Sequence, residues 1–117
     1  MVEIVNIIGE VEDKDVLIVD DLIDTAGTFV GAISALKDEG ANNIFGAITH
    51  PLLSGEAMER IEKSDLDKLF VTDTIDFSDK PKSEKIEVLS AADLFAEAIR
   101  RTFNNESISS LFNIDKG

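Results

Sequence analysis

The chain has 117 residues, enough for one packed core and too few for two. It carries 24 Asp+Glu against 11 Lys+Arg, and this net charge of −13 argues against nucleic acid or an anionic membrane as a partner. The absence of cysteine excludes disulfides, a thiol nucleophile and a Cys-ligated zinc site. No apolar run is long enough for a membrane span and no signal-peptide pattern opens the chain, so we expect a cytoplasmic protein.

The first half of the chain alternates short apolar runs with segments of helical periodicity, which predicts an α/β domain. An imperfect alternation over residues 3–9 suggests an edge strand. The apolar run at residues 16–19 predicts a parallel strand buried on both faces, which ends at Asp20 and Asp21. A helix is expected over residues 28–39, with Phe29, Ile33 and Leu36 on its buried face and Gly40 as its stop signal.

The second half repeats this order of strand and helix. Strands are expected at residues 44–48, 69–71 and 86–89, and a helix over residues 55–63 that buries Met58 and Ile61. The charged segment at residues 75–85 is predicted to be a surface loop. A last helix begins with Ser90 as N-cap and ends near Asn104, and the five aromatic residues Phe29, Phe45, Phe70, Phe95 and Phe103 are assigned to the core.

Polar side chains follow each predicted strand. Since ligands of open α/β sheets bind at the carboxyl edge of the strands, these residues indicate a site there. The lone histidine at such an end is most simply a structural or solvated residue. The four sets are Asp20 and Asp21; Thr49 and His50; Thr72, Asp73 and Thr74; and Ser90.

The segment Asp20–Thr28, DDLIDTAGT, joins a buried strand to the start of a helix. Backbone N–H groups at a helix N-terminus favour a phosphate, and Gly27 would permit a positive φ or a close backbone approach. The hydroxyls of Thr25 and Thr28 add further donors. Two carboxylates, those of Asp20 and Asp21, can accept hydrogen bonds from vicinal hydroxyls or hold hydrated Mg²⁺. A sugar phosphate offers both groups.

Two other interpretations stay open at this point. Asp and Thr at a strand-to-helix turn are also ordinary N-caps in proteins that bind nothing. A double Asp after an apolar strand is found in response-regulator receiver domains, where Asp73 would be the acceptor. That class also needs a Lys after a later strand, and here Ser90 follows residues 86–89.

The string IVDDLIDTAGT resembles the phosphoribosyl-binding loop of type I phosphoribosyltransferase-fold proteins. Together with AITHPLLSG, VTDTI, IEVLSAADLFAEAIRR and ESISSLF, it resembles the ribose-phosphate pyrophosphokinases over nearly the whole chain. The fold implied is a partial, Rossmann-like domain of three layers, with a mostly parallel sheet flanked by helices. The activity implied is transfer of the diphosphoryl group of ATP to ribose 5-phosphate, which yields phosphoribosyl diphosphate and AMP with Mg²⁺.

The resemblance also implies roles for residues. The ribose 5-phosphate site would consist of Asp20, Asp21, Asp24, Thr25, Ala26, Gly27 and Thr28. An allosteric phosphate or ADP site between subunits would include Ser107 and Ser109, and Phe112 would lie at the interface of a homo-oligomer, a hexamer in the family. No catalytic residue and no metal ligand is assigned to the chain itself.

Members of this family are two and a half to three times as long, so the resemblance implies that residues 1–117 are the C-terminal part of their second domain. The catalytic loop with its Lys and Arg would lie upstream. No Lys or Arg occurs between Asp15 and Leu36. We therefore expect the isolated chain to be inactive. Two alternatives remain, a non-catalytic regulatory subunit of the same fold and a transferase that uses phosphoribosyl diphosphate.

Overall fold

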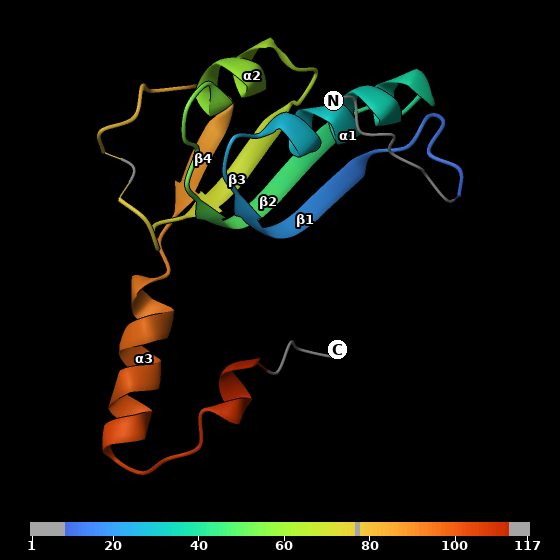
Figure 1. Ribbon diagram of the computed structural model, residues 1–117. Helices are drawn as coiled ribbons and strands as arrows, with labels where there is room; N and C mark the ends of the chain where they lie inside the picture. The colour runs from blue at the N-terminus through green and yellow to red at the C-terminus, as the bar shows by residue number, and fades with distance from the viewer. Residues whose placement is uncertain (1–8, 77, 113–117) are drawn as a thin grey trace.

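Four parallel strands form the centre of the computed structural model, which describes residues 9–76 and 78–112 (Figure 1). In chain order the strands are β1 (Val16–Ile23), β2 (Ile44–Pro51), β3 (Lys68–Thr72) and β4 (Ile86–Leu89), and they lie side by side in that same order. Each neighbouring pair is parallel. All four carboxyl ends therefore meet at one edge of the sheet, and the predicted α/β class is confirmed.

The helices are α1 (Gly27–Asp38), α2 (Ala57–Lys63) and α3 (Ala92–Phe103), followed by a 3₁₀ turn at Ser109–Phe112. Helices α1 and α2 lie on the same face of the sheet, whereas α3 points away from it (Figure 1). The expected segments match α1, α2 and β4 within two residues at each end. Within residues 9–76 and 78–112, no helix is long and apolar enough to cross a membrane.

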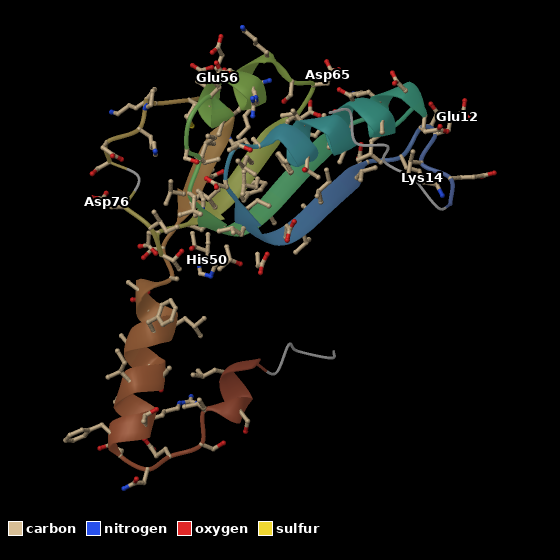
Figure 2. The ribbon with its side chains drawn as sticks, in the orientation of Figure 1. Glu12, Lys14, His50, Glu56, Asp65 and Asp76 are labelled. Atoms are coloured by element: carbon tan, nitrogen blue, oxygen red, sulfur yellow. The ribbon has the colours of Figure 1, made fainter. Side chains whose placement is uncertain are left out.

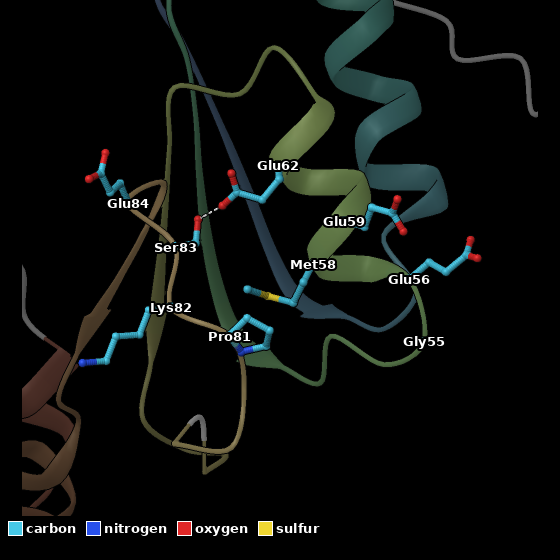
Figure 3. Close-up of a pocket in the computed structure, with 9 residues that line it drawn as sticks. All are labelled: Gly55, Glu56, Met58, Glu59, Glu62, Pro81, Lys82, Ser83 and Glu84. Atoms are coloured by element: carbon cyan, nitrogen blue, oxygen red, sulfur yellow. Dashed lines mark hydrogen bonds between the residues drawn. The ribbon is translucent and has the colours of Figure 1, made fainter.

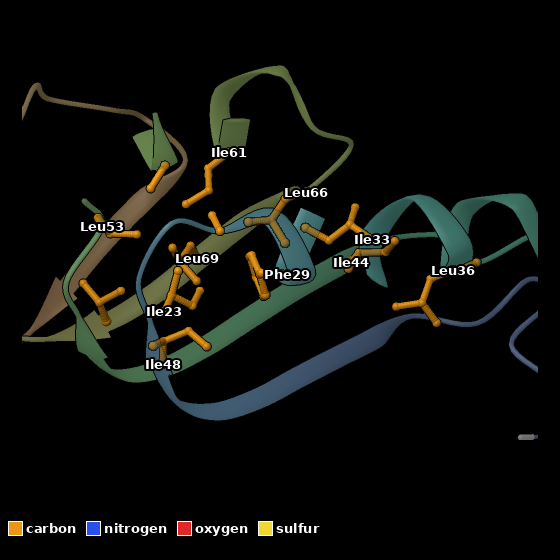
Figure 4. Packing of buried hydrophobic residues seen from close by; sticks show 14 residues of the cluster. Ile23, Phe29, Ile33, Leu36, Ile44, Ile48, Leu53, Ile61, Leu66 and Leu69 are labelled. Atoms are coloured by element: carbon orange, nitrogen blue, oxygen red, sulfur yellow. The ribbon is translucent and has the colours of Figure 1, made fainter. Parts of the chain in front are cut away.

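The core lies between the sheet and helices α1 and α2 (Figure 4). Ile33, Ile44, Ile61 and Leu69 have no exposed surface, as the helical period of α1 and α2 and the alternation of the strands predict. Burying an aliphatic side chain of this size stabilises the fold by about 1.5–3 kcal/mol. Phe29 is also buried, and its ring packs beside Gly46 of β2.

Helix α1 ends as predicted at Gly40. This glycine has φ of +90°, and its N–H donates to the carbonyl of Lys37, while the N–H of Ala41 donates to that of Leu36. The pair of bonds is a Schellman motif, which satisfies carbonyls at the end of the helix. Asn105, with φ of +57°, ends α3 in the same way through the bond from Glu106 to Arg101.

The prediction for β1 was wrong in two respects. The strand continues past Asp20 and Asp21 to Ile23, because pairing with β2 extends to Ile23 opposite Pro51. It is also not buried on both faces, since Leu17 is 58% exposed and Val19 71% exposed. β1 lies at the end of the strand order, and α1 and α2 cover only the other face.

The assignment of Phe95 and Phe103 to the core was also wrong, because these side chains are 54% and 86% exposed on a helix that stands clear of the sheet. Phe45 and Phe70 are half-buried. The N-cap of α3 is Ala91 rather than Ser90, whose hydroxyl accepts a hydrogen bond from the N–H of Ala92. Of the edge strand expected over residues 3–9, residues 3–8 lie outside the described part of the structure, as does the side chain of Phe112.

Candidate functional site

The segment Asp20–Thr28 leads from the exposed end of β1 into α1. Asp20 and Asp21 belong to β1, the turn contains Asp24 and Thr25, and the helix begins at Gly27. Both carboxylates are exposed, and the backbone N–H of Asp21 donates to Oδ1 of Asp20 at 2.7 Å. Because neighbouring residues of a strand point to opposite faces, the two side chains diverge.

The turn itself has an unusual backbone at Ala26. This buried N-cap residue has φ of +68°, and it makes no side-chain capping bond. The positive φ that we expected at Gly27 therefore lies one residue earlier. A side chain on Gly27 would meet only Nη1 of Arg60, at 3.7 Å. The left-handed residue lies directly before the first residue of α1. The helix has no capping side chain and no acidic residue in its first turn, so no side chain caps its backbone N–H groups there.

The loop after β2 holds this turn from the side. The N–H of Ser54 donates to the carbonyl of Asp24 at 2.9 Å, and the N–H of Leu53 to that of Ile23 at 3.2 Å. The Ser54 hydroxyl also donates to the Asp24 carboxylate. Leu53 is buried beneath the turn, with φ of +49°. The LSG part of AITHPLLSG is thus part of the architecture of the site.

Arg60 of α2 is the residue that sequence reasoning missed. Its Nη1 donates to the carbonyl of Thr25 at 2.9 Å. Thirty-five positions separate the two residues, and only the packing of α2 beside α1 brings the cation to a segment without Lys or Arg. No local signal in the sequence marks this arginine.

A hollow of about 330 Å³ opens at the turn. Six of the seven predicted ribose 5-phosphate residues line this hollow, and Asp21 is the exception. Apolar side chains of β1 and α1 complete the lining. The lining residues are Ile18, Asp20, Leu22, Ile23, Asp24, Thr25, Ala26, Gly27, Thr28, Phe29 and Ala32. The structure therefore gathers a helix N-terminus, two hydroxyls and two carboxylates around one space.

The other polar strand ends do meet at the carboxyl edge, where they bond to one another. His50 Nδ1 lies 2.9 Å from Oγ1 of Thr74, and the hydroxyls of Thr72 and Thr74 donate to the carbonyl of Thr49 at 2.6 and 3.0 Å. Figure 2 shows His50 at this edge. These contacts fit the structural role expected for the histidine.

A larger cavity, of about 640 Å³, lies between α2 and the loop before β4 (Figure 3). Its walls carry Glu56, Glu59 and Glu62, with Lys82 on the opposite side. The carboxylate of Glu62 accepts a hydrogen bond from Ser83. Glu84 also lines this cavity, so four carboxylates face one lysine and disfavour a phosphate more than the two carboxylates of the hollow do.

Ser107 and Ser109 lie beyond α3. Their hydroxyls are 2.8 Å apart, and Nη1 of Arg101 donates to the carbonyl of Ser107 at 3.4 Å and to the hydroxyl of Ser110. Glu97 pairs with Arg100 and Arg101, and these hydrogen bonds lower its pKa to about 2. The two serines are exposed and close to a guanidinium.

Three metal-binding side chains do not come together anywhere within residues 9–76 and 78–112. Mg²⁺ keeps several waters and binds through one or two carboxylates plus phosphates. Asp20 can supply one such carboxylate at the hollow, but these residues alone do not form a metal centre.

Comparisons with known proteins agree on one family. The family model described as "Phosphoribosyl synthetase-associated domain" matches residues 3–113. The ribose-phosphate pyrophosphokinase of Wolinella succinogenes is 54% identical over 110 residues, which cover 94% of this chain and 35% of the relative. The ribose-phosphate pyrophosphokinase of Staphylococcus saprophyticus is 49% identical over 111 residues, which cover 95% of this chain and 35% of the relative. The chain thus spans about a third of the length of these relatives.

A solved structure is also similar. The crystal structure of phosphoribosylpyrophosphate synthetase from Mycobacterium smegmatis superposes with a TM-score of 0.81 and 36% sequence identity. The match covers 84% of this chain and 33% of that protein. The parallel sheet with its flanking helices is thus an arrangement that the solved protein shares.

Proposed function

Because the chain belongs to the phosphoribosyl synthetase-associated domain family, we propose that Asp20–Thr28 is the ribose 5-phosphate site of a ribose-phosphate pyrophosphokinase. The whole enzyme would transfer the diphosphoryl group of ATP to the anomeric hydroxyl of ribose 5-phosphate, forming phosphoribosyl diphosphate and AMP. The observation that carries the proposal is the hollow at the start of α1, where a helix N-terminus without a side-chain cap meets exposed carboxylates. The two ribose-phosphate pyrophosphokinases are identical to this chain at about half of the aligned residues.

The 5-phosphate would bind at the turn. Backbone N–H groups at the start of α1 point along the helix axis toward an anion, and the helix dipole adds positive potential there. The hydroxyls of Thr25 and Thr28 line the same hollow and can donate to phosphate oxygens. Asp24, bonded to Ser54, would hold the turn in shape rather than contact the phosphate directly.

The ribose would lie toward β1. Asp20 lines the hollow, and its carboxylate can accept hydrogen bonds from two vicinal hydroxyls. Asp21 belongs to the same proposed set but does not line the hollow. This arrangement would orient the sugar with its phosphate on the helix and its hydroxyls on the strand.

ATP and Mg²⁺ complete the proposal for the whole enzyme. The ion would neutralise charge on the transferred diphosphoryl group when ATP is bound. At the hollow, the carboxylates of Asp20 and Asp24 are the groups that could contact this ion. The residues of this chain would bind and orient the sugar phosphate.

We further propose that residues 1–117 correspond to the C-terminal part of the second domain of such an enzyme and that the isolated chain makes no phosphoribosyl diphosphate. The support is that the chain spans 35% of its relatives' length and that Asp15–Leu36 contains no Lys or Arg. A hexameric assembly in the cytoplasm belongs to the same proposal. Product formation by the purified chain with ATP and Mg²⁺ would contradict it.

Ser107 and Ser109 are proposed as part of an allosteric anion site. The support is their mutual hydrogen bond and the nearby Arg101. A non-catalytic regulatory subunit would use this region but not the hollow. Binding of inorganic phosphate that is lost in Ser107→Ala and Ser109→Ala, with ribose 5-phosphate binding intact, would separate the two sites.

Calorimetric titration of ribose 5-phosphate tests the proposed function. We expect saturable binding to the chain and a loss of about tenfold or more in Thr28→Ala and Asp24→Ala, because each loses hydrogen bonds at or under the phosphate. Ser34→Ala, on the exposed side of α1, is the control. Equal heats from all the proteins would rule out the assignment.

A further inference from the structure

Arg60 lies against the proposed phosphate turn on two sides. Its Nη1 donates to the carbonyl of Thr25 at 2.9 Å, and the same atom is 3.7 Å from the position that a Cβ on Gly27 would occupy. The guanidinium is therefore bonded to the residue before Ala26 and lies close to the space beside Gly27, the residue after it. Both contacts come from α2, whose Ala57 and Ile61 are fully buried, so the arginine is mounted on a fixed element.

The bond to Thr25 determines where the next amide points. All described peptide bonds are trans, and in a trans peptide the C=O and the N–H point in opposite directions. With the Thr25 carbonyl directed to Arg60, the N–H of Ala26 is directed away from α2. Ala26 is held in the left-handed region, which is unfavourable for a residue with a Cβ, and the bond to Arg60 helps to maintain that conformation.

Arg60 also changes the charge balance of the turn. Asp20, Asp21 and Asp24 would oppose an incoming phosphate, and the segment between Asp15 and Leu36 has no cation of its own. Glu56 lies 3.6 Å from Nη2, but the two side chains are 41% and 73% exposed. An exposed pair of this kind is weak and screened by solvent, so positive charge remains available beside the turn.

We propose that Arg60 is a positioning residue for phosphate binding, which holds the Thr25–Gly27 backbone in its binding conformation and adds one positive charge to a turn that carries three carboxylates. This inference rests on the proposed function of the turn. The residue acts through the backbone of the turn and need not touch the reacting atoms. It explains how a loop without Lys or Arg binds a dianion in a chain of net charge −13.

The test compares Arg60→Gln with Lys63→Gln. Lys63 lies on the same helix and pairs with Glu59 at 2.7 Å, so this variant is a matched loss of charge away from the turn. Ribose 5-phosphate is titrated calorimetrically at low and at high salt, and ¹⁵N relaxation of Ala26 and Gly27 reports the order of the turn. A residue that only stabilised the overall fold would leave the salt dependence of binding unchanged and would not selectively raise the mobility of these two amides.

For Arg60→Gln we expect about tenfold weaker binding at low salt, a smaller salt dependence, and more mobile Ala26 and Gly27 amides. Lys63→Gln should match the wild type in all three. Arg60→Lys keeps the charge without the planar donor, so it should restore the salt dependence but not the rigid turn.

The outcomes separate the two proposals. If the wild type does not bind ribose 5-phosphate, the proposed function fails. If the Ala26 and Gly27 amides of Arg60→Gln are as rigid as those of the wild type, the positioning role of Arg60 fails. If the wild type binds and Arg60→Gln binds equally well with the same salt dependence, the assignment of Arg60 is wrong while the site stands.

Discussion

The carboxylate of Asp73 accepts a hydrogen bond of 2.7 Å from the backbone N–H of Ala91. This contact joins the residue after β3 to the N-cap of α3, and the Ser90 hydroxyl donates to the same carboxylate at 2.7 Å. The two bonds fix the point at which α3 leaves the sheet. A polar residue at a strand end, which the sequence suggests as part of a ligand site, here caps a helix.

Replacing Asp73 with Asn should loosen the start of α3. The bonds from Ala91 and Ser90 lower the pKa of Asp73 from 3.8, so the carboxylate stabilises the fold above that pH and the contribution disappears as the pH falls through the lowered value. The protection factor of the Ala91 amide, its intrinsic exchange rate divided by the observed rate at the same pH, should fall in Asp73→Asn at neutral pH and in the wild type only in acid. Asp76→Asn, which replaces a carboxylate that accepts hydrogen bonds from Ser78, is the control. Unchanged Ala91 exchange in Asp73→Asn would contradict the capping role.

Glu97→Gln should reduce the helicity of α3. The carboxylate bonds to Arg100 at 2.6 Å and to Arg101 at 2.8 Å, and its pKa is lowered to about 2. The stabilisation is therefore complete above pH 4.5 and is lost as the pH falls toward 2. Secondary chemical shifts of α3 across this range should show a larger pH-dependent loss in the wild type than in Glu97→Gln, where only the pair of Arg100 with Glu106 remains. The same pH profile in both proteins would exclude the Glu97 carboxylate as the source of the pH-dependent stability of α3.

Gly46→Ala should destabilise the core while Gly31→Ala should stabilise the protein. A Cβ on Gly46 would lie 2.8 Å from Cδ1 of Leu69 and 2.8 Å from Cζ of Phe29, an overpacking that costs about 1–3 kcal/mol. Gly31 lies within α1 with nothing within 4 Å of such an atom, so alanine gains about 0.5–1 kcal/mol of helix propensity. Urea denaturation measures both, and equal midpoints would contradict the packing described for β2.

Asp20→Asn should weaken ribose 5-phosphate binding by about tenfold and Asp21→Asn by less than about threefold. The reason is that Asp20 lines the hollow and Asp21 does not. Both variants remove one negative charge from adjacent exposed positions, so each controls for the electrostatic effect of the other. Calorimetric titration distinguishes them, and a larger loss in Asp21→Asn would mean that the sugar lies on the opposite face of β1.

Helix α1, the strands and the DDLIDTAGT turn could be predicted because residues close together in the sequence determine them. Phe29, Ile33 and Leu36 recur at the helical period, and Gly40 supplies the positive φ that ends α1. The strands follow from apolar runs bounded by polar residues, and parallel pairing brings their carboxyl ends together. The DDLIDTAGT turn was recognisable for the same reason, since its residues are consecutive.

The tertiary structure decided the features that depend on residues far apart in the sequence but close in space. The burial of a residue depends on whether another element covers it, so Phe95 has helical spacing and yet is exposed on α3. The positive φ belongs to Ala26 because the loop at Ser54 and the guanidinium of Arg60 hold the turn. By itself, the sequence determined a parallel α/β fold and a turn suited to phosphate; only the packing of α2 beside α1 brought a cation from 35 residues away to that turn.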